Sequence, residues 1–184
     1  MEHSIYESKP CGALKADGGR CRKRTARDHK CWMHGIKEKK VKVCPSTLGA
    51  NVGLGLFARA SVRGVDPEKV VFEKGDSVCT YQGEILTRDQ VNRRYPGDAI
   101  ATYALEIGRD KFIDARKTTS CYGRYANARY RTNVEMGNPA GKNGNYVNLV
   151  AKRPIKDGQE IFVRYGRPGE VRWNRNDFYG PVVR

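Results

Sequence analysis

From residue 43 onward, the chain consists of short apolar runs separated by Gly, Pro, Asn and Asp. Runs of about four to eight residues between such turn-forming residues are typical of β-strands. In residues 102–107 (TYALEI), Tyr103, Leu105 and Ile107 stand at every second position, which is the pattern of a half-buried strand. The sequence therefore predicts a mainly β fold with little helix. We expect strands at residues 55–60, 77–81, 102–107, 111–114, 147–151 and 160–165.

One short helix is expected within this β-rich part, at residues 88–94 (RDQVNRR). Thr87 precedes it and is a suitable N-cap, and Pro96 prevents the helix from continuing. Residues 137–144 (GNPAGKNG) consist of small and turn-forming residues apart from one lysine. We therefore expect an exposed loop there.

The length of 184 residues is enough for one core with a small appendage. The sequence contains no run of 18 apolar residues, so we expect no membrane-spanning helix. The first ten residues (MEHSIYESKP) are too polar for a secretory signal peptide, which predicts a protein that is not secreted. Three of the six cysteines are clustered near the start, and this distribution favours a reducing compartment and a metal site over a disulfide framework.

The net charge of +15 is large for this length and predicts attraction to polyanions. Nucleic acid, nucleosomal DNA and an acidic protein surface are the candidate partners. Because Lys and Arg occur along the whole chain, a basic surface that only aids solubility is the alternative interpretation. The densest basic run contains Arg20, Arg22, Lys23, Arg24, Arg27, Lys30, Lys37, Lys39, Lys40 and Lys42.

The N-terminal segment has a spacing of cysteines and histidine that suits a metal ion, at Cys11, Cys21, Cys31 and His34. Three thiolates and one imidazole form a usual structural zinc shell, and four protein ligands leave no open catalytic position. Residues 1–36 contain few large apolar side chains, so they could hardly fold without such a ligand. We therefore predict a zinc-binding knuckle over residues 1–36.

Alternatives remain for this segment. His29 could supply the nitrogen ligand in place of His34, and the cysteines could be unconnected reduced thiols. The basic residues within the knuckle favour contact with nucleic acid as a secondary hypothesis. Residues 37–42 (KEKKVK) are interpreted as a basic linker to the β-rich part.

Four motifs follow one another in the β-rich part. They are residues 53–58 (GLGLFA), 81–84 (YQGE), 124–127 (RYAN) and 155–166 (IKDGQEIFVRYG). Their order and spacing resemble the SET domain of protein lysine methyltransferases, as do Thr102-Tyr103 and residues 113–115 (IDA). The resemblance implies a SET-type β-fold with a knot-like C-terminal crossing over residues 43–166.

The resemblance extends to the C-terminal tail, residues 167–184. No cysteine follows Cys121, so a cysteine-rich segment that closes the channel in many SET enzymes is absent from this sequence. Trp173, Phe178 and Tyr179 could form an aromatic lid instead, as in the minimal SET proteins of large DNA viruses. Simple packing of the tail is the alternative.

The resemblance also implies S-adenosylmethionine as the methyl donor and assigns roles to individual residues. Tyr165 is the expected catalytic tyrosine, whose hydroxyl would orient the donor methyl, and Tyr81 is expected to line the lysine channel. A lysine with a reference pKa of about 10.4 must arrive there unprotonated, in a dry and well-aligned site. The residues expected to bind the cofactor are Val52, Gly53, Leu54, Thr102, Tyr103, Arg124, Tyr125, Asn127 and Ala128.

The third motif departs from the family pattern R-F-I-N-H-S-C-x-P-N. Arg124, Asn127 and Asn133 are kept, whereas Ala128 stands in place of the histidine and Arg129 in place of the serine. The contacts of the missing imidazole cannot form, which concerns cofactor affinity more than the fold.

The implied function is an S-adenosylmethionine-dependent protein-lysine N-methyltransferase that acts on histone tails. It would work in the nucleus or on chromatin, and in a host nucleus if the chain is viral. A degenerate, non-catalytic SET module that binds nucleic acid or chromatin through the knuckle and the basic surface is the alternative. The acidic residues expected to contact a basic substrate are Glu84, Glu106, Asp110 and Asp114.

Overall fold

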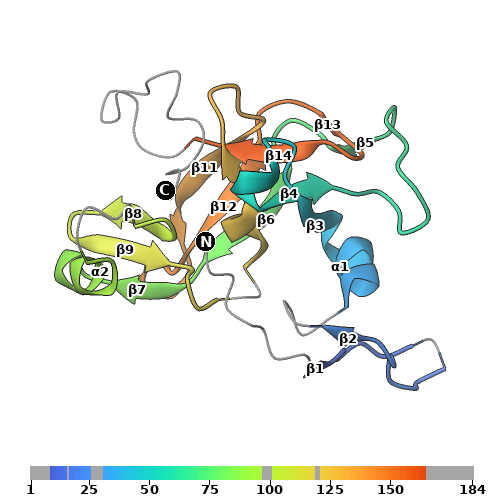
Figure 1. The fold of residues 1–184 in the computed structure, drawn as a ribbon, viewed down its shortest axis with the longest axis horizontal. Helices are drawn as coiled ribbons and strands as arrows, with labels where there is room; N and C mark the ends of the chain where they lie inside the picture. The colour runs from blue at the N-terminus through green and yellow to red at the C-terminus, as the bar shows by residue number, and fades with distance from the viewer. Residues whose placement is uncertain (1–8, 16, 26–30, 97–100, 119–120, 165–184) are drawn as a thin grey trace.

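The computed structural model describes residues 9–15, 17–25, 31–96, 101–118 and 121–164. Within these ranges the fold is mainly β, with two α-helices and three 3-10 helices among short strands (Figure 1). This confirms the predicted fold class. Neither α-helix of the described part is long and apolar enough to cross a membrane.

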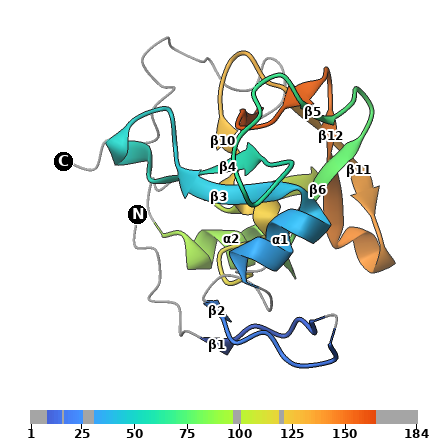
Figure 2. The ribbon, with the colours of Figure 1, turned by 90° about the vertical axis from the view of Figure 1, so that its right-hand side faces the viewer.

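The N-terminal unit contains the strands β1 (Lys9–Pro10) and β2 (Arg24–Thr25), which pair in antiparallel orientation. Helix α1 (Trp32–Lys39) follows and leads into β3 (Val41–Pro45). Figure 2 shows α1 between the β1–β2 ribbon and β3. The expectation of a linker at residues 37–42 was therefore wrong, because these residues form the end of α1 and the start of β3.

The change from α1 to β3 occurs at one residue. Lys40 adopts a left-handed conformation with φ 54°, and its N–H donates to the carbonyl of Ile36. This is a common way for a helix to end. Val41, directly afterwards, is buried in the main core. The β-rich body thus begins at Val41, two residues earlier than expected.

A four-stranded sheet has the order β10-β14-β4-β3. Its members besides β3 are β10 (Asn127–Ala128), β14 (Glu160–Val163) and β4 (Leu54–Ala58). β10 and β14 pair in parallel, whereas β4 is antiparallel to both β14 and β3. The parallel pair is the part of the expected C-terminal crossing that the described residues contain. The predicted strand 160–165 ends at Val163, and Tyr165 lies outside the described residues.

Three further sheets surround this one. The three-stranded sheet β11-β12-β6 contains β11 (Val134–Ala140), β12 (Tyr146–Ala151) and β6 (Ser77–Gln82). The sheet β7-β9-β8 contains β7 (Glu84–Leu86), β9 (Lys111–Asp114) and β8 (Ala104–Gly108). The pair β13-β5 contains β13 (Ile155–Lys156) and β5 (Val70–Phe72). The 3-10 helices are η1 (Ala50–Val52), η2 (Tyr122–Tyr125) and η3 (Lys142–Gly144).

The main core lies between these sheets. It includes large apolar side chains from β4, β9, β12, β13 and β14. These fully buried side chains are Leu56, Ile113, Leu149, Ile155 and Ile161. A second, smaller cluster of Leu86, Val91 and Phe112 packs beneath helix α2 (Arg88–Arg94).

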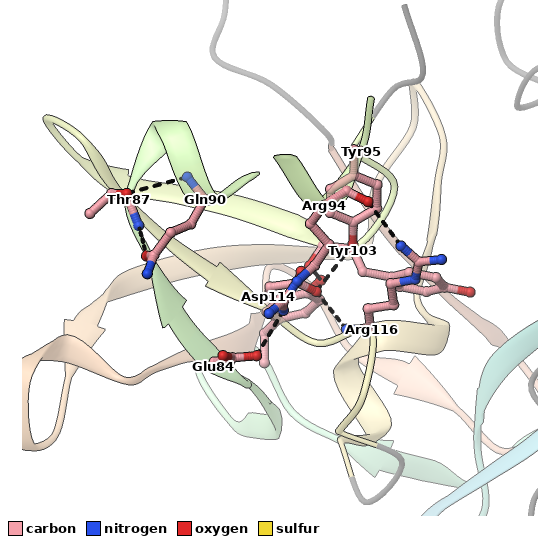
Figure 3. A network of polar contacts seen from close by, with 9 residues as sticks. Glu84, Thr87, Gln90, Arg94, Tyr95, Tyr103, Asp114 and Arg116 are labelled. Atoms are coloured by element: carbon pink, nitrogen blue, oxygen red, sulfur yellow. Dashed lines mark hydrogen bonds and ion pairs between the residues drawn. The ribbon is translucent and has the colours of Figure 1, made fainter. Parts of the chain in front are cut away.

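Helix α2 lies where the sequence predicts it. Thr87 is its N-cap, and Thr87 and Gln90 form a reciprocal capping box (Figure 3). Such a box satisfies two of the N–H groups that have no partner within the helix. The signal is local in the sequence, which explains why the prediction succeeds.

Two other expectations need correction. The strand expected at residues 102–107 begins only at Ala104, because Thr102 and Tyr103 lie in a turn that the Ala104 N–H closes on the carbonyl of Ala101. The loop expected at residues 137–144 belongs to β11 as far as Ala140. β11 is an edge strand whose register shifts between Met136 and Pro139, and irregular edge strands tolerate proline.

Candidate active site and metal centre

The glycine-rich loop connects η1 with β4. Gly53 has φ 83° and ψ −121°, a conformation that favours glycine, and its carbonyl accepts a hydrogen bond from the Ser46 N–H at 2.9 Å. Val52, Gly53 and Leu54, predicted to bind the cofactor, are all half-buried. The loop therefore presents backbone groups at a surface that a ligand can reach.

Asn127 joins this loop to the third motif. Its Nδ2 atom donates to the Leu54 carbonyl and to Oε1 of Glu160, both at 3.1 Å. Both partners are acceptors, so they fix the orientation of the amide and use both of its N–H groups. The polar atom with which Asn127 can meet a ligand is therefore its carbonyl oxygen, Oδ1.

Glu160 is the centre of this network and is buried. Besides Asn127, it accepts hydrogen bonds from Ser46 Oγ at 2.7 Å, from the Thr47 N–H at 2.8 Å and from Thr47 Oγ1. Several such hydrogen bonds offset the free-energy cost of burying a carboxylate. Glu160 was not among the predicted site residues, and the signal that could have identified it is its place within the last motif, residues 155–166.

The side chain of Asn133 connects the third motif to the backbone of β14 by two hydrogen bonds. Its Nδ2 donates to the Glu160 carbonyl, and its Oδ1 accepts from the Phe162 N–H, each at 2.8 Å. Asn133 is buried, so these bonds satisfy groups that water cannot reach. Together with the β10–β14 ladder, they set the position of residues 127–133 along β14.

The guanidinium of Arg124 lies against the aromatic rings of Tyr103 and Tyr125. The guanidinium carbon of Arg124 is 4.4 Å from the ring centroid of Tyr103 and 5.4 Å from that of Tyr125. The Tyr81 hydroxyl donates to the carbonyl of Tyr103 at 2.7 Å. The structure thus brings together four residues to which the sequence assigned roles in the site, whereas Thr102, in the same turn as Tyr103, is exposed.

The replaced positions of the third motif lie along β14. Ala128 pairs with Val163 in the parallel ladder, and the Arg129 N–H donates to the Val163 carbonyl at 3.1 Å. The guanidinium of Arg129 lies 5.2 Å from the ring centroid of Phe162. The backbone at residue 128 is therefore held by the ladder and does not depend on an imidazole side chain.

Asp114 is not available to a substrate, contrary to the expectation. It is buried and accepts hydrogen bonds from Arg94 Nη1 at 3.0 Å, from the Tyr95 hydroxyl at 3.1 Å and from the Arg116 N–H at 2.7 Å (Figure 3). Arg94 Nη1 also lies 2.8 Å from Oε2 of Glu84. The hydrogen bond from Arg94 lowers the pKa of Glu84, and burial beside Asp114 raises the pKa of Tyr95.

The other two acidic candidates are also engaged. Glu106 forms an exposed ion pair with Arg88 at 2.9 Å, and Asp110 accepts from the Arg88 N–H at 2.7 Å. Of the four acidic candidates, Glu84 and Glu106 are exposed, and the carboxylate of each forms an ion pair with an arginine side chain.

The glycine of the second motif has a packing role. A Cβ on Gly83 would lie 2.1 Å from the carbonyl oxygen of Asp114, so no other residue fits without moving the backbone. Gly123 in η2 is similarly close to the carbonyl of Thr80, at 2.7 Å. Gly83 therefore lets the second motif pack closely against the end of β9, and Gly123, directly before the third motif, packs against β6.

The four predicted metal ligands come together in the N-terminal unit. The ligand atoms of Cys11, Cys21, Cys31 and His34 all lie within 4.8 Å of one another. Nδ1 of His34 is 3.3 Å from Sγ of Cys31 and 3.6 Å from Sγ of Cys11. A tetrahedral zinc ion with ordinary bond lengths separates sulfur and nitrogen ligands by about 3.5 Å. The geometry and the donor set therefore fit zinc. His29, the alternative nitrogen ligand, lies outside the described residues.

Local structure explains how the cluster forms. Cys31 is the N-cap residue of α1 and His34 lies in the first helical turn, so both ligands face the same end of the helix. The backbone N–H of Cys31 donates to Sγ of Cys11 at 3.1 Å. Burial opposes ionisation of both thiols, but hydrogen bonds from the Cys31 and Ala13 N–H groups lower the pKa of Cys11, whereas the pKa of Cys31 is raised.

All six cysteines lie in the described part, and each is a free thiol. The catalytic tyrosine expected at Tyr165 and the aromatic lid residues Trp173, Phe178 and Tyr179 lie outside it. The roles of these four residues remain predictions from the sequence.

Comparison with known proteins assigns the family. A family model described as the SET domain matches residues 53–166. Because this match covers more than half of the chain, the chain belongs to the SET domain family.

Two relatives bear on function. The chain is similar to Histone-lysine N-methyltransferase Set2 of Drosophila melanogaster, with 22% identity over 168 residues, and the match covers 87% of the chain but only 6% of that protein. It is also similar to a solved structure titled "ctPRC2 in an autoinhibited conformation bound to S-adenosylmethionine", with 27% identity and a TM-score of 0.53. That match covers 70% of this chain and 15% of the other. The chain thus spans a small fraction of the length of both relatives.

Proposed function

We propose that the chain is an S-adenosylmethionine-dependent protein-lysine N-methyltransferase that acts on histone tails in the nucleus. The observation that carries this proposal is the link from Asn127 to Leu54 and Glu160, which holds the glycine-rich loop, the third motif and the last strand in one arrangement. In a member of the SET domain family, these are the elements that the cofactor would contact.

The residues present fit the cofactor. S-adenosylmethionine carries an ammonium and a sulfonium cation, and Asn127 can offer Oδ1 as an acceptor because its N–H groups are used internally. Val52, Gly53 and Leu54 offer half-buried backbone beside it. When bound, the cofactor supplies an electrophilic methyl group.

The chain's own residues would align the reaction and exclude water. Tyr81 is buried and its hydroxyl is fixed on the Tyr103 carbonyl, so it can form a rigid wall of a lysine channel. Tyr165, in the closing motif, would orient the methyl group with a hydroxyl that stays neutral near pH 7. Entry of the substrate amine into a dry channel lowers its pKa and favours the unprotonated nucleophile.

The second part of the proposal is a structural zinc ion held by Cys11, Cys21, Cys31 and His34. In the part of this unit that the structure describes, the buried cluster consists of Cys11, Ala13 and Cys31, with Cys21 and Met33 packed against it. So little apolar burial does not stabilise a fold, whereas a structural zinc ion does. Its role is to fold the knuckle and fix the start of α1.

Calorimetry with S-adenosylmethionine tests the cofactor site. We expect binding of about one cofactor per chain, weakened by about tenfold or more in Asn127→Ala, since a hydrogen bond to a charged group is lost. Asn92→Ala, at an exposed position of α2, is the matched control and should bind like the wild type. Undetectable binding by the wild-type chain would contradict the proposal and favour the non-catalytic SET module.

A methylation assay with Tyr165→Phe tests the enzyme role separately from cofactor binding. We expect this variant to bind the cofactor but to lose most of the methyl transfer to a lysine peptide. Wild-type activity in Tyr165→Phe would show that another group performs the orienting role. A peptide array then identifies whether histone tails or other proteins carry the target lysine.

A further inference from the structure

Basic charge is concentrated at the N-terminal unit. Residues 9–42 contain twelve Lys and Arg but only three Asp and Glu, so this fifth of the sequence carries +9 of the net charge of +15. In the described part of this unit, seven of these side chains are exposed on β2, on residues 20–23 directly before it, and on α1 with its C-cap. They are Arg20, Arg22, Lys23, Arg24, Lys37, Lys39 and Lys40.

A large aromatic side chain is exposed within this basic surface. Trp32, the first residue of α1, is 51% exposed, although it directly follows the buried metal ligand Cys31. Nζ of Lys42 lies 5.3 Å from the centroid of its ring. The indole ring therefore has a cation beside it and a large surface that faces solvent. At this exposed position it contributes little to the buried core.

We infer that Trp32, Lys42 and the exposed basic side chains of β2 and α1 form a binding site for single-stranded nucleic acid. In this site, an unpaired base stacks on the indole of Trp32, and the phosphates lie along the Lys and Arg side chains. Exposed aromatic rings within a basic surface are the usual means of holding single strands without sequence preference.

The exposed Trp32 favours single-stranded nucleic acid over duplex DNA and an acidic protein as the partner. Duplex DNA and an acidic protein would be attracted by charge alone, and neither presents an unstacked base face to an indole. The predicted metal site adds rigidity, because the ligands Cys31 and His34 lie on the same end of α1 as Trp32. This proposal needs a folded knuckle but does not depend on methyl transfer.

Fluorescence anisotropy of the zinc-loaded full chain, without S-adenosylmethionine, tests the site. The probes are labelled single-stranded RNA, single-stranded DNA and duplex DNA of about 12 nucleotides, within the known range of site sizes. We expect both single strands to bind more tightly than the duplex. Trp32→Ala should weaken single-strand binding about tenfold, as the loss of one stacked base does, and Trp32→Phe should restore most of it.

A charge-matched pair of variants tests the phosphate contacts. Arg22→Gln with Lys23→Gln should weaken binding and reduce the salt dependence of the affinity, because fewer counterions are released. Lys74→Gln with Arg153→Gln removes the same charge from exposed positions of the SET body and should have a much smaller effect.

Three results of the binding experiments would overturn the inference. They are no binding of single strands, equal binding of duplex with no effect of Trp32→Ala, and equal competition by polyglutamate with no effect of Trp32→Ala. Zinc content is measured for every variant to detect unfolding. Ultraviolet crosslinking of the wild-type chain does not depend on any variant: we expect crosslinks in the peptide that contains Trp32, and crosslinks confined to other peptides would overturn the inference.

Discussion

The carboxylate of Glu160 occupies the space that a side chain at Gly55 would need. A Cβ at position 55 would lie 2.1 Å from Oε1 of Glu160. Glycine is therefore needed at these two positions of the loop for different physical reasons: Gly53 adopts a positive φ, whereas Gly55 leaves room for the carboxylate. The second glycine serves the internal network rather than the close approach of a cofactor.

Gly55→Ala is expected to destabilise the fold. The added methyl must displace Glu160 from its hydrogen bonds, and overpacking of this kind costs about 1–3 kcal/mol. Urea denaturation measures the change. Gly64→Ala is the control, because nothing lies within 4 Å of its Cβ position; it should leave stability nearly unchanged. Equal stability of the two variants would contradict the packing role of Gly55.

Asn133→Ala is expected to lower the free energy of unfolding more strongly. It leaves the carbonyl of Glu160 and the N–H of Phe162 buried without their partner, at about 1–3 kcal/mol for each group. Asn138→Ala, at an exposed position of β11, should change little. If chemical denaturation finds a loss below about 1 kcal/mol for Asn133→Ala, the bonds to β14 do not hold the third motif.

Glu84→Gln is expected to change the acid dependence of stability. The hydrogen bond from Arg94 lowers the pKa of Glu84 in the folded state. Its contribution is therefore present above the unfolded pKa of about 4.3 and is lost as pH falls through the lower folded value. Because the carboxylate is half exposed, the effect is at most about 1 kcal/mol.

The measurement for Glu84 is the difference in unfolding free energy between neutral pH and a pH near 3. This difference should be smaller in Glu84→Gln than in the wild type. Glu135→Gln, at an exposed position, serves as the control. An unchanged acid dependence in Glu84→Gln would show that the ion pair with Arg94 contributes nothing in solution.

Metal analysis should find about one zinc per chain, and Cys21→Ser should reduce it. Removal of zinc by a chelator should increase hydrogen exchange in the first turn of α1, because Cys31 and His34 lose their common partner. Exchange in β4 and β12, within the main core, should change much less. A chain with no bound zinc, or one whose α1 is insensitive to the chelator, would contradict the metal centre.

Local signals made part of the fold predictable. Helix α2 has its N-cap Thr87 and the proline that follows its end within ten residues, and the sequence predicts both; the box partner Gln90 was not predicted. Helix α1 was missed because Gly35 lies inside it, which lowers the helical propensity of this short segment. Its start depends on Cys31, which clusters with Cys11 and Cys21 from earlier in the chain, and its end depends on the left-handed Lys40.

The site was predictable as a set of motifs but not as a network. Arg124, Asn127 and Asn133 were identified from their order along the chain, and the structure brings Asn127 and Asn133 onto β14. The role of Glu160 was not visible, because its partners Ser46 and Thr47 lie more than 110 residues earlier in the chain. Long-range contacts of this kind depend on the completed sheet β10-β14-β4-β3.

The most direct test of the proposed function is mass spectrometry of histone-tail peptides incubated with the chain and S-adenosylmethionine. The account predicts methyl groups on a lysine side chain with the wild-type chain and little or no methylation with Tyr165→Phe. Absence of lysine methylation on histone peptides and on intact histones, by a chain that contains zinc and binds the cofactor, would contradict it.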